Sequence, residues 1–375
     1  MADNASMIPM NDLSRGFASD RAEIEAAVNG VLASGWYIHG ANHDAFEHEF
    51  AGYLGVAHCV GVANGTDALV AALAALEIGE GARVCLAANA GFYGSTACLA
   101  VGARPHYVDI DLGTATLDLS ALRAALETGP DAVIYTHLYG DGRAAEAVAS
   151  LCREFDVPLI EDCAQAAGAR LAGKSIGTFG TIGCFSFYPT KNLAALGDAG
   201  AVISDDSDVA ERLRRIRQYG WVRRYEVSTK GFNSRLDEVQ AAVLRVRLQR
   251  LDERNERRRE ILRSYASALS DTEKERLFFA DEEAHVGHLA VIVSNDREAL
   301  HAHLQEHGVS SDVHYPIADD AQAIWREQSV NYVSESLSAT HEACSTVLSV
   351  PLFPELTDGE VEQVTAALRR FGASR

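Results

Sequence analysis

Lysine is scarce in this chain of 375 residues. Only Lys174, Lys191, Lys230 and Lys274 occur, and the rest of the 33 basic residues are arginines. A mechanism that needs a side-chain amine as its nucleophile therefore has four candidates. The chain also lacks any run of about 18 or more apolar residues that is free of charged and turn residues, so no membrane span is expected.

Closely spaced cysteines and a signal-like N-terminus are absent as well. The seven cysteines are scattered, and no C-x-x-C pair occurs. This pattern is typical of free thiols buried in a reducing cytosol. The N-terminal sequence MADNASMIPMNDLSRG has no basic segment followed by an apolar one, as a secretory signal would. We therefore expect a cytoplasmic protein.

The chain also has no excess of positive charge. The 33 basic and 53 acidic residues give a net charge of -20, and the isoelectric point is about 5.0. Such a field repels nucleic acid and anionic membranes, so neither is an expected partner. Hydrophobic residues make up 47% of the chain and charged residues 23%, which favours a folded protein large enough for two domains.

Short apolar segments alternate with helical patterns over the first two thirds of the chain. The segments are 59–63, 83–88, 104–111, 132–140, 158–164, 183–189 and 201–206. Alternation of this kind predicts an α/β domain with a mostly parallel sheet. Near the N-terminus, residues 20–35 predict an amphipathic helix with Asp20 as its N-cap and Gly35 as its terminator.

The last third of the chain has a different pattern. From Ser234 to Leu269 it is one long helical stretch, in which interleaved acidic residues favour a solvated, ion-paired face over nucleic-acid binding. A strand at 289–294 and helices at 296–308 and 358–371 then predict a smaller α+β domain. We place the boundary near residue 250, which gives a large domain of residues 1–250 and a C-terminal domain of residues 251–375.

The stretch NGTDAL, residues 64–69, follows a predicted strand and opens a helix. The free N–H groups at a helix N-terminus, with the hydroxyl of Thr66, can bind a phosphate close to Gly65. The alternative is an ordinary strand-to-helix turn with a Thr or Asp cap.

The stretch LIEDCAQA, residues 159–166, places Asp162 where an apolar strand ends. Ligands of parallel sheets bind at that edge. A carboxylate there needs a partner: a protonated ring nitrogen is one, and an arginine or a helix cap is the structural alternative. Gln165 lies three residues further on, beside the same predicted edge.

The stretch SFYPTKNL, residues 186–193, places Ser186 at a strand end, five residues before Lys191. A hydroxyl and an amine on one irregular segment suit an anion and an imine, although a single lysine in a loop is more often exposed and without a role. In this order, a phosphate site, a strand-end Asp and a later Lys suit pyridoxal 5'-phosphate (PLP).

The sequence resembles the DegT/DnrJ/EryC1/StrS family of sugar aminotransferases, which have the fold-type-I, aspartate aminotransferase-like architecture. The matching stretches are GVANGTDAL, GARPHYVDID, PLIEDCAQAAGA, GTIGCFSFYPTKNLAALGDAGAVISDD and GFNSRLDEVQAAVL, in the family's order and over nearly the whole chain.

The resemblance implies a role for each matching position. Lys191 would hold the cofactor aldehyde as an imine and shuttle protons, Asp162 would bind the pyridine nitrogen, and Gln165 would lie against the ring or its 3-oxygen. The residues that would hold the phosphate are Gly65, Thr66 and Ser186. Asn233 matches an asparagine that reaches the phosphate of the neighbouring subunit, which implies a homodimer with shared sites.

One segment departs from the family's pattern. Where relatives place an aromatic on the cofactor ring, this chain has NAGFYGS, residues 89–95. We expect Phe92 to stack on the ring, with Tyr93 as the alternative. Members that deoxygenate sugars have a histidine in place of the lysine, so Lys191 favours transamination.

Weaker candidates concern the substrate. His314 and Tyr315 match a position that approaches the sugar in relatives, and Tyr188 lies near Lys191; the alternative for His314 is a structural role before a proline turn. Arg224, in YGWVRRYE, is a candidate for a diphosphate contact or an ordinary exposed loop arginine. The histidine pairs 285/288 and 301/303 lack matching ligands, so no metal is expected.

The expected reaction moves an amino group from an amino acid, with L-glutamate as the expected donor, through pyridoxamine phosphate to a nucleotide-linked keto-6-deoxyhexose. The NAGFY variant favours amination at C4, and so a dTDP-4-keto-6-deoxyglucose substrate. The alternatives are amination at C3 and a non-catalytic regulator, which the presence of Lys191, Asp162 and the phosphate set disfavours.

Overall fold

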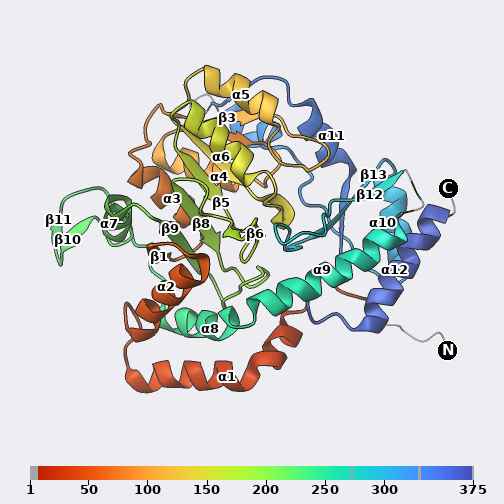
Figure 1. Ribbon diagram of the computed structural model, residues 1–375, viewed down its shortest axis with the longest axis horizontal. Helices are drawn as coiled ribbons and strands as arrows, with labels where there is room; N and C mark the ends of the chain where they lie inside the picture. The colour runs from red at the N-terminus through yellow and green to blue at the C-terminus, as the bar shows by residue number, and fades with distance from the viewer. Residues whose placement is uncertain (1–6, 271, 273, 328–330, 374–375) are drawn as a thin grey trace.

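The computed structural model describes residues 7–270, 272, 274–327 and 331–373 (Figure 1). Its largest element is an eight-stranded sheet in the order β1-β9-β8-β5-β4-β2-β3-β14. The strand bounds, in that order, are His58–Val62, Gly200–Ser204, Ile182–Ser186, Leu159–Asp162, Ala132–Thr136, Arg83–Ala87, Arg104–Val108 and Val333–Ser334. All neighbouring pairs from β8 to β14 are parallel, and β9 is antiparallel to both of its neighbours. The predicted α/β class with a mostly parallel sheet is therefore confirmed.

Helices cover both faces of this sheet, which explains why its strands are almost continuously apolar. The helices α3 (Gly65–Ala75), α4 (Tyr93–Val101) and α7 (Ser207–Ile216) pack on one face. On the other face lie α2 (Ala41–Leu54), α5 (Leu119–Glu127) and α6 (Ala145–Glu154). All seven cysteines are buried and unpaired.

A second, smaller core follows the large sheet in the chain. A three-stranded antiparallel sheet is formed by β12 (Glu275–Leu277), β13 (Ala290–Ser294) and β15 (Val347–Val350). The helices beside it are α10 (Arg297–Glu306), α11 (Ser338–Thr346) and α12 (Asp358–Ala373). The helix α9 (Leu251–Ala268) contributes to this core and follows α8 (Glu238–Leu248), which packs on α1 and α2 beside the large sheet.

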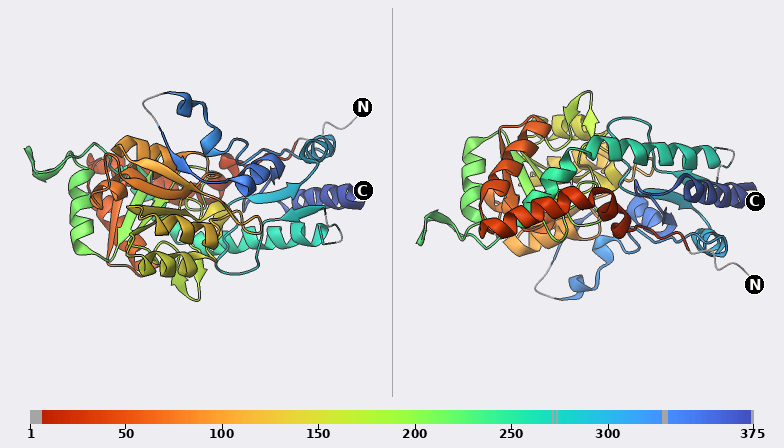
Figure 2. Two further views of the ribbon diagram at one scale, coloured as in Figure 1. Left: turned by 90° about the horizontal axis from the view of Figure 1, so that it is seen from above. Right: turned by 90° about the horizontal axis from the view of Figure 1, so that it is seen from below.

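We propose that the two units divide near residue 250, at the α8–α9 junction. The chain crosses between them at two further places. Ile8 packs in the smaller core and bonds to Gly308, and β14, late in the chain, pairs with β3 of the large sheet. Figure 2 shows the long α9 running from the large unit into the smaller one. Among the described helices, none combines the length and apolar character that crossing a membrane requires.

Two sequence-based expectations about helices are wrong. The first helix, α1, spans Leu13–Ser34, and its N-cap is Asp12 rather than Asp20. Asp20 lies fully buried within α1, where Arg250 and Arg254 bind its carboxylate. The acidic residue that was predicted to cap the helix therefore forms ion pairs with arginines that are distant in the sequence. The predicted single helix over 234–269 is divided into α8 and α9 at residues 249–250.

Two short strand pairs, each of strands of two or three residues, complete the described part of the fold. The strands β6 (Arg170–Leu171) and β7 (Lys174–Ser175) form one hairpin, and β10 (Trp221–Arg223) and β11 (Glu226–Val227) form another. The second hairpin projects away from the body of the chain, at the end opposite the termini (Figures 1 and 2). Short 3-10 turns occur at Leu138–Gly140, Asp319–Ala321 and Ala323–Arg326.

Candidate active site

A cavity of about 670 Å³ opens at the carboxyl ends of three neighbouring strands. Thr136, Asp162 and Ser186 are the last residues of β4, β5 and β8, and all three line it. This is the edge at which parallel sheets bind ligands. The predicted residues that line the cavity are Gly65, Thr66, Asp162, Gln165, Ser186, Tyr188, Lys191, His314 and Tyr315. Residues separated by up to 250 positions in the chain thus meet in one site.

The N-terminus of α3 forms one wall of the cavity. The side chain of Asn64 caps the helix by accepting from the N–H of Asp67 at 2.8 Å, and the N–H groups of Gly65 and Thr66 have no partner inside the helix. A Cβ at Gly65 would lie 2.6 Å from the Cβ of Ser186, so only glycine fits against this serine. The arrangement suits an anion such as a phosphate.

Asp162 is buried at the base of the cavity. Its carboxylate accepts from Ala164 N at 3.1 Å and from Thr136 Oγ1 at 3.2 Å. Burial raises the pKa of Asp162, and the charge of Lys191 works against that rise. A buried carboxylate with so few donors is stabilised by a cation, and a protonated ring nitrogen is one.

Lys191 reaches the same cavity from the loop after β8. Burial lowers the pKa of its amine to about 8, and the Asp162 carboxylate opposes this shift. A larger fraction of Lys191 is therefore a free amine near neutral pH than of an exposed lysine, as nucleophilic attack on an aldehyde requires. The backbone N–H of Lys191 bonds to Tyr188 O at 2.8 Å, which fixes the loop.

Gln165, His314 and Tyr315 are joined by hydrogen bonds. Gln165 accepts from Tyr139 N at 2.7 Å through Oε1, and its Nε2 donates to Tyr315 Oη at 3.3 Å. The hydroxyl of Tyr139 donates to His314 O at 2.6 Å. These bonds fix one side of the cavity and leave Tyr188 as a half-exposed ring at its rim.

The expectation that Phe92 stacks on the cofactor ring does not fit the structure. Gly91 and Phe92 both have positive φ angles, of 78° and 71°, which turn the chain just before α4. The Phe92 ring consequently packs on Trp325, with centroids 5.6 Å apart, and is not part of the cavity wall. Tyr93, the alternative, does line the cavity and lies beside Tyr315, at 6.3 Å between ring centroids.

Two further predicted residues lie away from the cavity of their own chain. Arg224 is exposed on the β10–β11 hairpin, where its guanidinium lies 4.9 Å from the Tyr225 ring centroid. Asn233 is exposed beyond the same hairpin, in a single bridge with Gln218. A single chain therefore does not bring either side chain to Lys191.

Several residues of the cavity wall were not predicted from the sequence. His288 was weighed only as half of a metal pair, and Asp198 and Asp312 carried no recognisable motif; all three line the cavity. Among the described residues, the group with metal-like spacing is His137, Glu161 and Cys163, whose ligand atoms lie within 4.8 Å. Glu161 is already bonded to His137 and to three backbone N–H groups there.

The fold and this site define an aminotransferase that uses PLP. The chain belongs to the DegT/DnrJ/EryC1/StrS aminotransferase family, whose model matches residues 18–369. The resemblance, the fold type, the enzyme class and the cofactor expected from the sequence are confirmed.

Individual relatives match over nearly their whole length. The dTDP-3-amino-3,6-dideoxy-alpha-D-galactopyranose transaminase of Aneurinibacillus thermoaerophilus is 40% identical, over 98% of this chain and 100% of that protein. The UDP-N-acetyl-3-dehydro-alpha-D-glucosamine 3-aminotransferase of Acidithiobacillus ferrooxidans is 38% identical, over 97% of each. The crystal structure of Streptomyces venezuelae DesV in complex with a ketimine intermediate is 36% identical, with a TM-score of 0.93 over 98% of this chain and 99% of that one.

Proposed function

We propose that this protein transfers an amino group from an amino acid, with L-glutamate as the donor, to a nucleotide-linked keto-6-deoxyhexose. The observation that carries the proposal is the meeting of three features in one cavity. These are the amine of Lys191 with its lowered pKa, the buried carboxylate of Asp162, and the anion site formed by Gly65, Thr66 and Ser186.

The residues present fit PLP and have distinct tasks. When bound, the cofactor supplies an electron-accepting ring and a carbonyl carbon that takes up the amino group. Gly65, Thr66 and Ser186 would hold its phosphate, and Asp162 would keep its ring nitrogen protonated. Lys191, once free as an amine, takes the proton from the α-carbon of the amino donor and holds it at Nζ.

We propose C3 as the position that receives the amine. The NAGFY segment favoured C4 and a dTDP-4-keto-6-deoxyglucose substrate, on the strength of one departure from the family's pattern. The two relatives described above, at 40% and 38% identity over nearly the whole chain, are both named as enzymes that place the amine at C3. A 3-keto-6-deoxyhexose linked to a nucleoside diphosphate is therefore the better supported acceptor.

The sugar would lie between the rim of the cavity and the cofactor. Tyr188 supplies a half-exposed ring and hydroxyl there, and His314 and Tyr315 supply polar groups held by the bonds to Tyr139 and Gln165. Ser349 fixes the His314 ring through a 2.9 Å contact with Nδ1. Held groups of this kind can discriminate between ketones at C3 and C4, because a mispositioned hydroxyl leaves a buried polar partner unbonded.

A second copy of the chain would complete the site. In the described part of the chain, Lys191 is the one cationic side chain among the residues that line the cavity, although phosphate and diphosphate groups are both to be bound there. Arg224 and Asn233 are exposed and do not line the cavity of their own chain. They lie on or beside the β10–β11 hairpin, which projects from the body of the chain. We infer that they enter the cavity of a partner subunit in a homodimer with shared sites.

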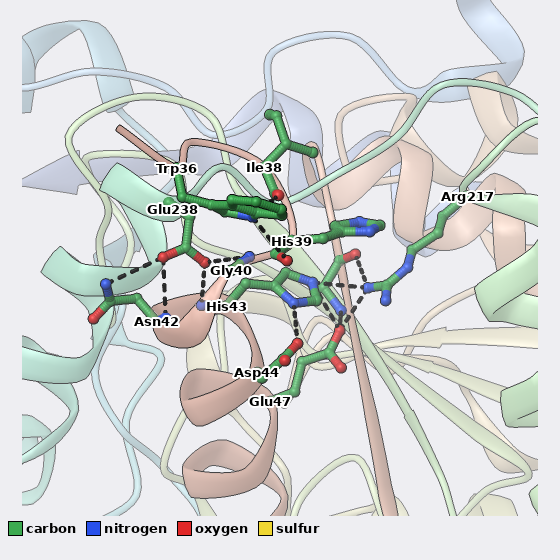
Figure 3. Close-up of polar contacts among 11 residues, drawn as sticks. Trp36, Ile38, His39, Gly40, Asn42, His43, Asp44, Glu47, Arg217 and Glu238 are labelled. Carbon is green, nitrogen blue, oxygen red and sulfur yellow. Dashed lines mark hydrogen bonds and ion pairs between the residues drawn. The ribbon is translucent and has the colours of Figure 1, made fainter. Parts of the chain in front are cut away.

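An exposed aromatic segment supports this dimer. Trp36 and Tyr37 are 63% and 50% exposed, yet the segment is held firmly. Trp36 Nε1 donates to Ile38 O at 2.7 Å, and the carboxylate of Glu238 accepts from the N–H groups that follow, including Gly40 at 2.8 Å (Figure 3). A large apolar surface fixed in one conformation is typical of a protein interface.

The deciding experiment supplies purified protein, PLP and L-glutamate with either a 3-keto or a 4-keto nucleotide sugar. The expected product carries the new amine at C3, as proton NMR would report. Amination at C4 alone would refute the C3 assignment and leave the enzyme class standing. If the protein takes up PLP but no amino donor converts it to the pyridoxamine form, the transferase proposal fails and the regulator alternative is favoured.

Shared sites can be tested by mixing two inactive proteins. Lys191→Ala lacks the amine, and a double variant with Arg224→Ala and Asn233→Ala lacks the groups assigned to the partner's cavity. Random reassembly of subunits should restore about a quarter of the wild-type activity, because half of the dimers are mixed and each mixed dimer has one intact site. If each site were built from a single chain, both chains of every mixed dimer would still carry a defective site. No activity would then return, and the proposal of shared sites would be refuted.

A further inference from the structure

Asp319 is a buried carboxylate that follows Tyr315, a residue of the cavity wall, by four positions. Its backbone N–H donates to Ala88 O at 2.7 Å, one residue beyond the end of β2. Its backbone carbonyl accepts from Trp325 Nε1 at 2.6 Å. These bonds fix the segment after Tyr315 against the large sheet, so the place of the Asp319 side chain is set by the fold.

The carboxylate of Asp319 binds the start of α4 from outside that helix. Its Oδ1 accepts from Phe92 N at 3.0 Å, and its Oδ2 accepts from Ser95 Oγ at 2.8 Å. The N-cap position of α4 is held by Phe92, whose ring cannot accept a hydrogen bond from the helix. Because a helix N-terminus has unbonded N–H groups and favours negative charge, Asp319 takes the part of the missing capping side chain.

The bonds at Ser95 are consistent with a charged Asp319. The hydroxyl of Ser95 gives its one hydrogen to Asp319, so the Tyr107 hydroxyl, 2.8 Å away, donates to Ser95 Oγ. Burial raises the pKa of Asp319 to about 7, and the bonds from Ser95 and Phe92 work against that rise. Above that pH the carboxylate is an acceptor for both donors.

The turn that Asp319 binds has a backbone shape that side chains with a Cβ rarely adopt. The φ angles are 78° at Gly91 and 71° at Phe92, and the second is unfavourable without an outside contact. With this shape the Phe92 ring packs on Trp325, 5.6 Å away, while Tyr93 lines the cavity, 6.3 Å from the Tyr315 ring. A Cβ at Gly91 would lie 2.9 Å from Tyr315 Cε1, so the turn packs directly on that ring.

We propose that Asp319 is a positioning residue for Tyr93: its carboxylate holds the turn at residues 91–92 in the shape that places the Tyr93 ring in the cavity, against the cofactor. Asp319 itself does not line the cavity and acts through Tyr93. The inference rests on the proposed function for its consequence at the cofactor. The capping contact is a property of the protein alone.

Two substitutions of Asp319 separate loss of the contact from loss of the charge. Asp319→Ala removes both acceptors. Asp319→Asn keeps an oxygen for Phe92 N, and its amide NH₂ can donate to Ser95 Oγ. Asp320→Ala is the matched control, because it removes the neighbouring carboxylate, which bonds to His341 at 2.9 Å.

The first measurement is hydrogen exchange of the full-length protein without PLP, at about pH 8, where Asp319 is charged. Mass spectrometry follows peptides that span residues 89–95. In Asp319→Ala the Phe92 amide should exchange about 10–100-fold faster, because its acceptor is lost, and peptides from β4 and β5 should be unchanged. Asp319→Asn and Asp320→Ala should stay within about threefold of the wild type. An unchanged rate in Asp319→Ala, or an equal rise in Asp320→Ala, would overturn the proposal.

The wild type gives a test that needs no variant to fold. Its Phe92 amide should exchange at least about tenfold more slowly than the same amide in an unstructured peptide of this sequence. Equal rates would overturn the proposal, because the turn would then not be held.

The second measurement is a double-mutant cycle on the affinity for PLP, read from the imine absorbance at ~420 nm. Tyr93→Ala and Asp319→Ala should each raise the Kd by about 3–10-fold, since each removes an aromatic contact with the cofactor ring. Asp319→Asn should bind PLP within about twofold of the wild type. The double variant should bind within about twofold of Tyr93→Ala, because a residue that acts through Tyr93 then has nothing left to position.

Two outcomes of the cycle would overturn the proposal. One is an additive loss in the double variant, which would mean that Asp319 acts on PLP binding by another route. The other is a Kd that either single substitution leaves unchanged. Neither measurement uses the amino donor or the sugar, so failure of the proposed transfer reaction would leave both readable.

Discussion

Two carboxylates next to each other on β5 differ in almost every respect except their burial. Glu161 and Asp162 point to opposite faces of the sheet because side chains alternate along a strand. Glu161 accepts from His137 at 2.9 Å and from the backbone N–H groups of Gly177, Phe179 and Gly180 at 3.0, 2.6 and 2.7 Å. Asp162 accepts from two donors, both at more than 3 Å.

The number of donors decides the direction of each pKa. Burial works to raise the pKa of Glu161, but the bond from His137 and the backbone donors outweigh it, and the pKa lies below its usual value. At Asp162 the same burial wins, and the pKa is raised. A saturated buried carboxylate holds the fold together, while an under-bonded one at a cavity is available to a ligand.

Replacement of Asp162 should give the largest effect on activity. Asp162→Asn keeps the size of the side chain but removes the charge that the ring nitrogen of the cofactor requires, so we expect kcat to fall by about 10³-fold. The free energy of unfolding of the apo protein should change by no more than about 1 kcal/mol, because a costly buried charge is removed with few bonds. Steady-state kinetics and urea unfolding measure the two quantities. Retention of more than a tenth of the activity would place Asp162 outside the reaction.

Replacement of Glu161 should lower the stability of the protein much more than its activity, the reverse of the effect expected at Asp162. Glu161→Gln puts an amide NH₂ among three N–H donors, so we expect the free energy of unfolding to fall by about 2–4 kcal/mol. The activity of the molecules that remain folded should stay within tenfold of the wild type. Glu154→Gln is the control, since Glu154 pairs with Arg123 on the surface and its loss should not be measurable. A stability equal to the wild type would end the distinction drawn between the two carboxylates.

The amine of Lys191 offers a finer measurement of the Asp162 charge. The rate at which the apo protein takes up PLP should rise with pH and reach half its maximum near about 8, the value to which burial lowers the pKa of Lys191. In Asp162→Asn the midpoint should move to lower pH, because the carboxylate is what opposes that shift. Appearance of the imine absorbance near ~420 nm follows the reaction, and Lys191→Ala should lack this band. A midpoint close to the 10.5 of an exposed lysine would contradict the burial seen here.

A third buried carboxylate extends the comparison at a smaller scale. Asp319 accepts from Phe92 N at 3.0 Å and Ser95 Oγ at 2.8 Å, and burial raises its pKa to about 7 from 3.8. Between these two values the folded protein binds a proton that the unfolded chain has released, so stability is lost as the pH rises through this window. Asp319→Asn should flatten the pH dependence of stability between about pH 5 and about pH 7 by about 1–2 kcal/mol. Thermal unfolding at the two pH values measures it, and a slope equal to the wild type would mean that Asp319 ionises normally.

Local patterns were sufficient for much of the fold. The apolar strands that end at Ala87, Thr136, Asp162 and Ser186 were recognisable because both faces of the sheet are covered, which requires nearly continuous apolar residues. The start of α1 was missed because Asp20 has the chemistry of a cap, and only its distant ion pairs with Arg250 and Arg254 explain it. The break between α8 and α9 was missed for a related reason, since the helical pattern continues through it.

The residues of the site also fall into those that the sequence predicts and one that it does not. Asp162, Gly65 and Ser186 lie at strand ends or a helix start, and Lys191 lies in the loop that follows β8, so their meeting follows from the topology of a parallel sheet. Phe92 was assigned to the ring because it is the aromatic nearest to the family's position. The positive φ angles at 91 and 92, which no composition reveals, turn it onto Trp325 instead.

The sequence alone determined the class of chemistry, because an amine, an acid and an anion site in a set order at strand ends leave few cofactors that fit them. It also placed Lys191 among only four possible nucleophiles. The tertiary structure decided how each group behaves: which carboxylate is saturated with hydrogen-bond donors, and which lysine is buried. Those properties depend on backbone N–H donors such as Gly177, Phe179 and Gly180, which have the same chemistry in every sequence and acquire a role only through their position in the fold.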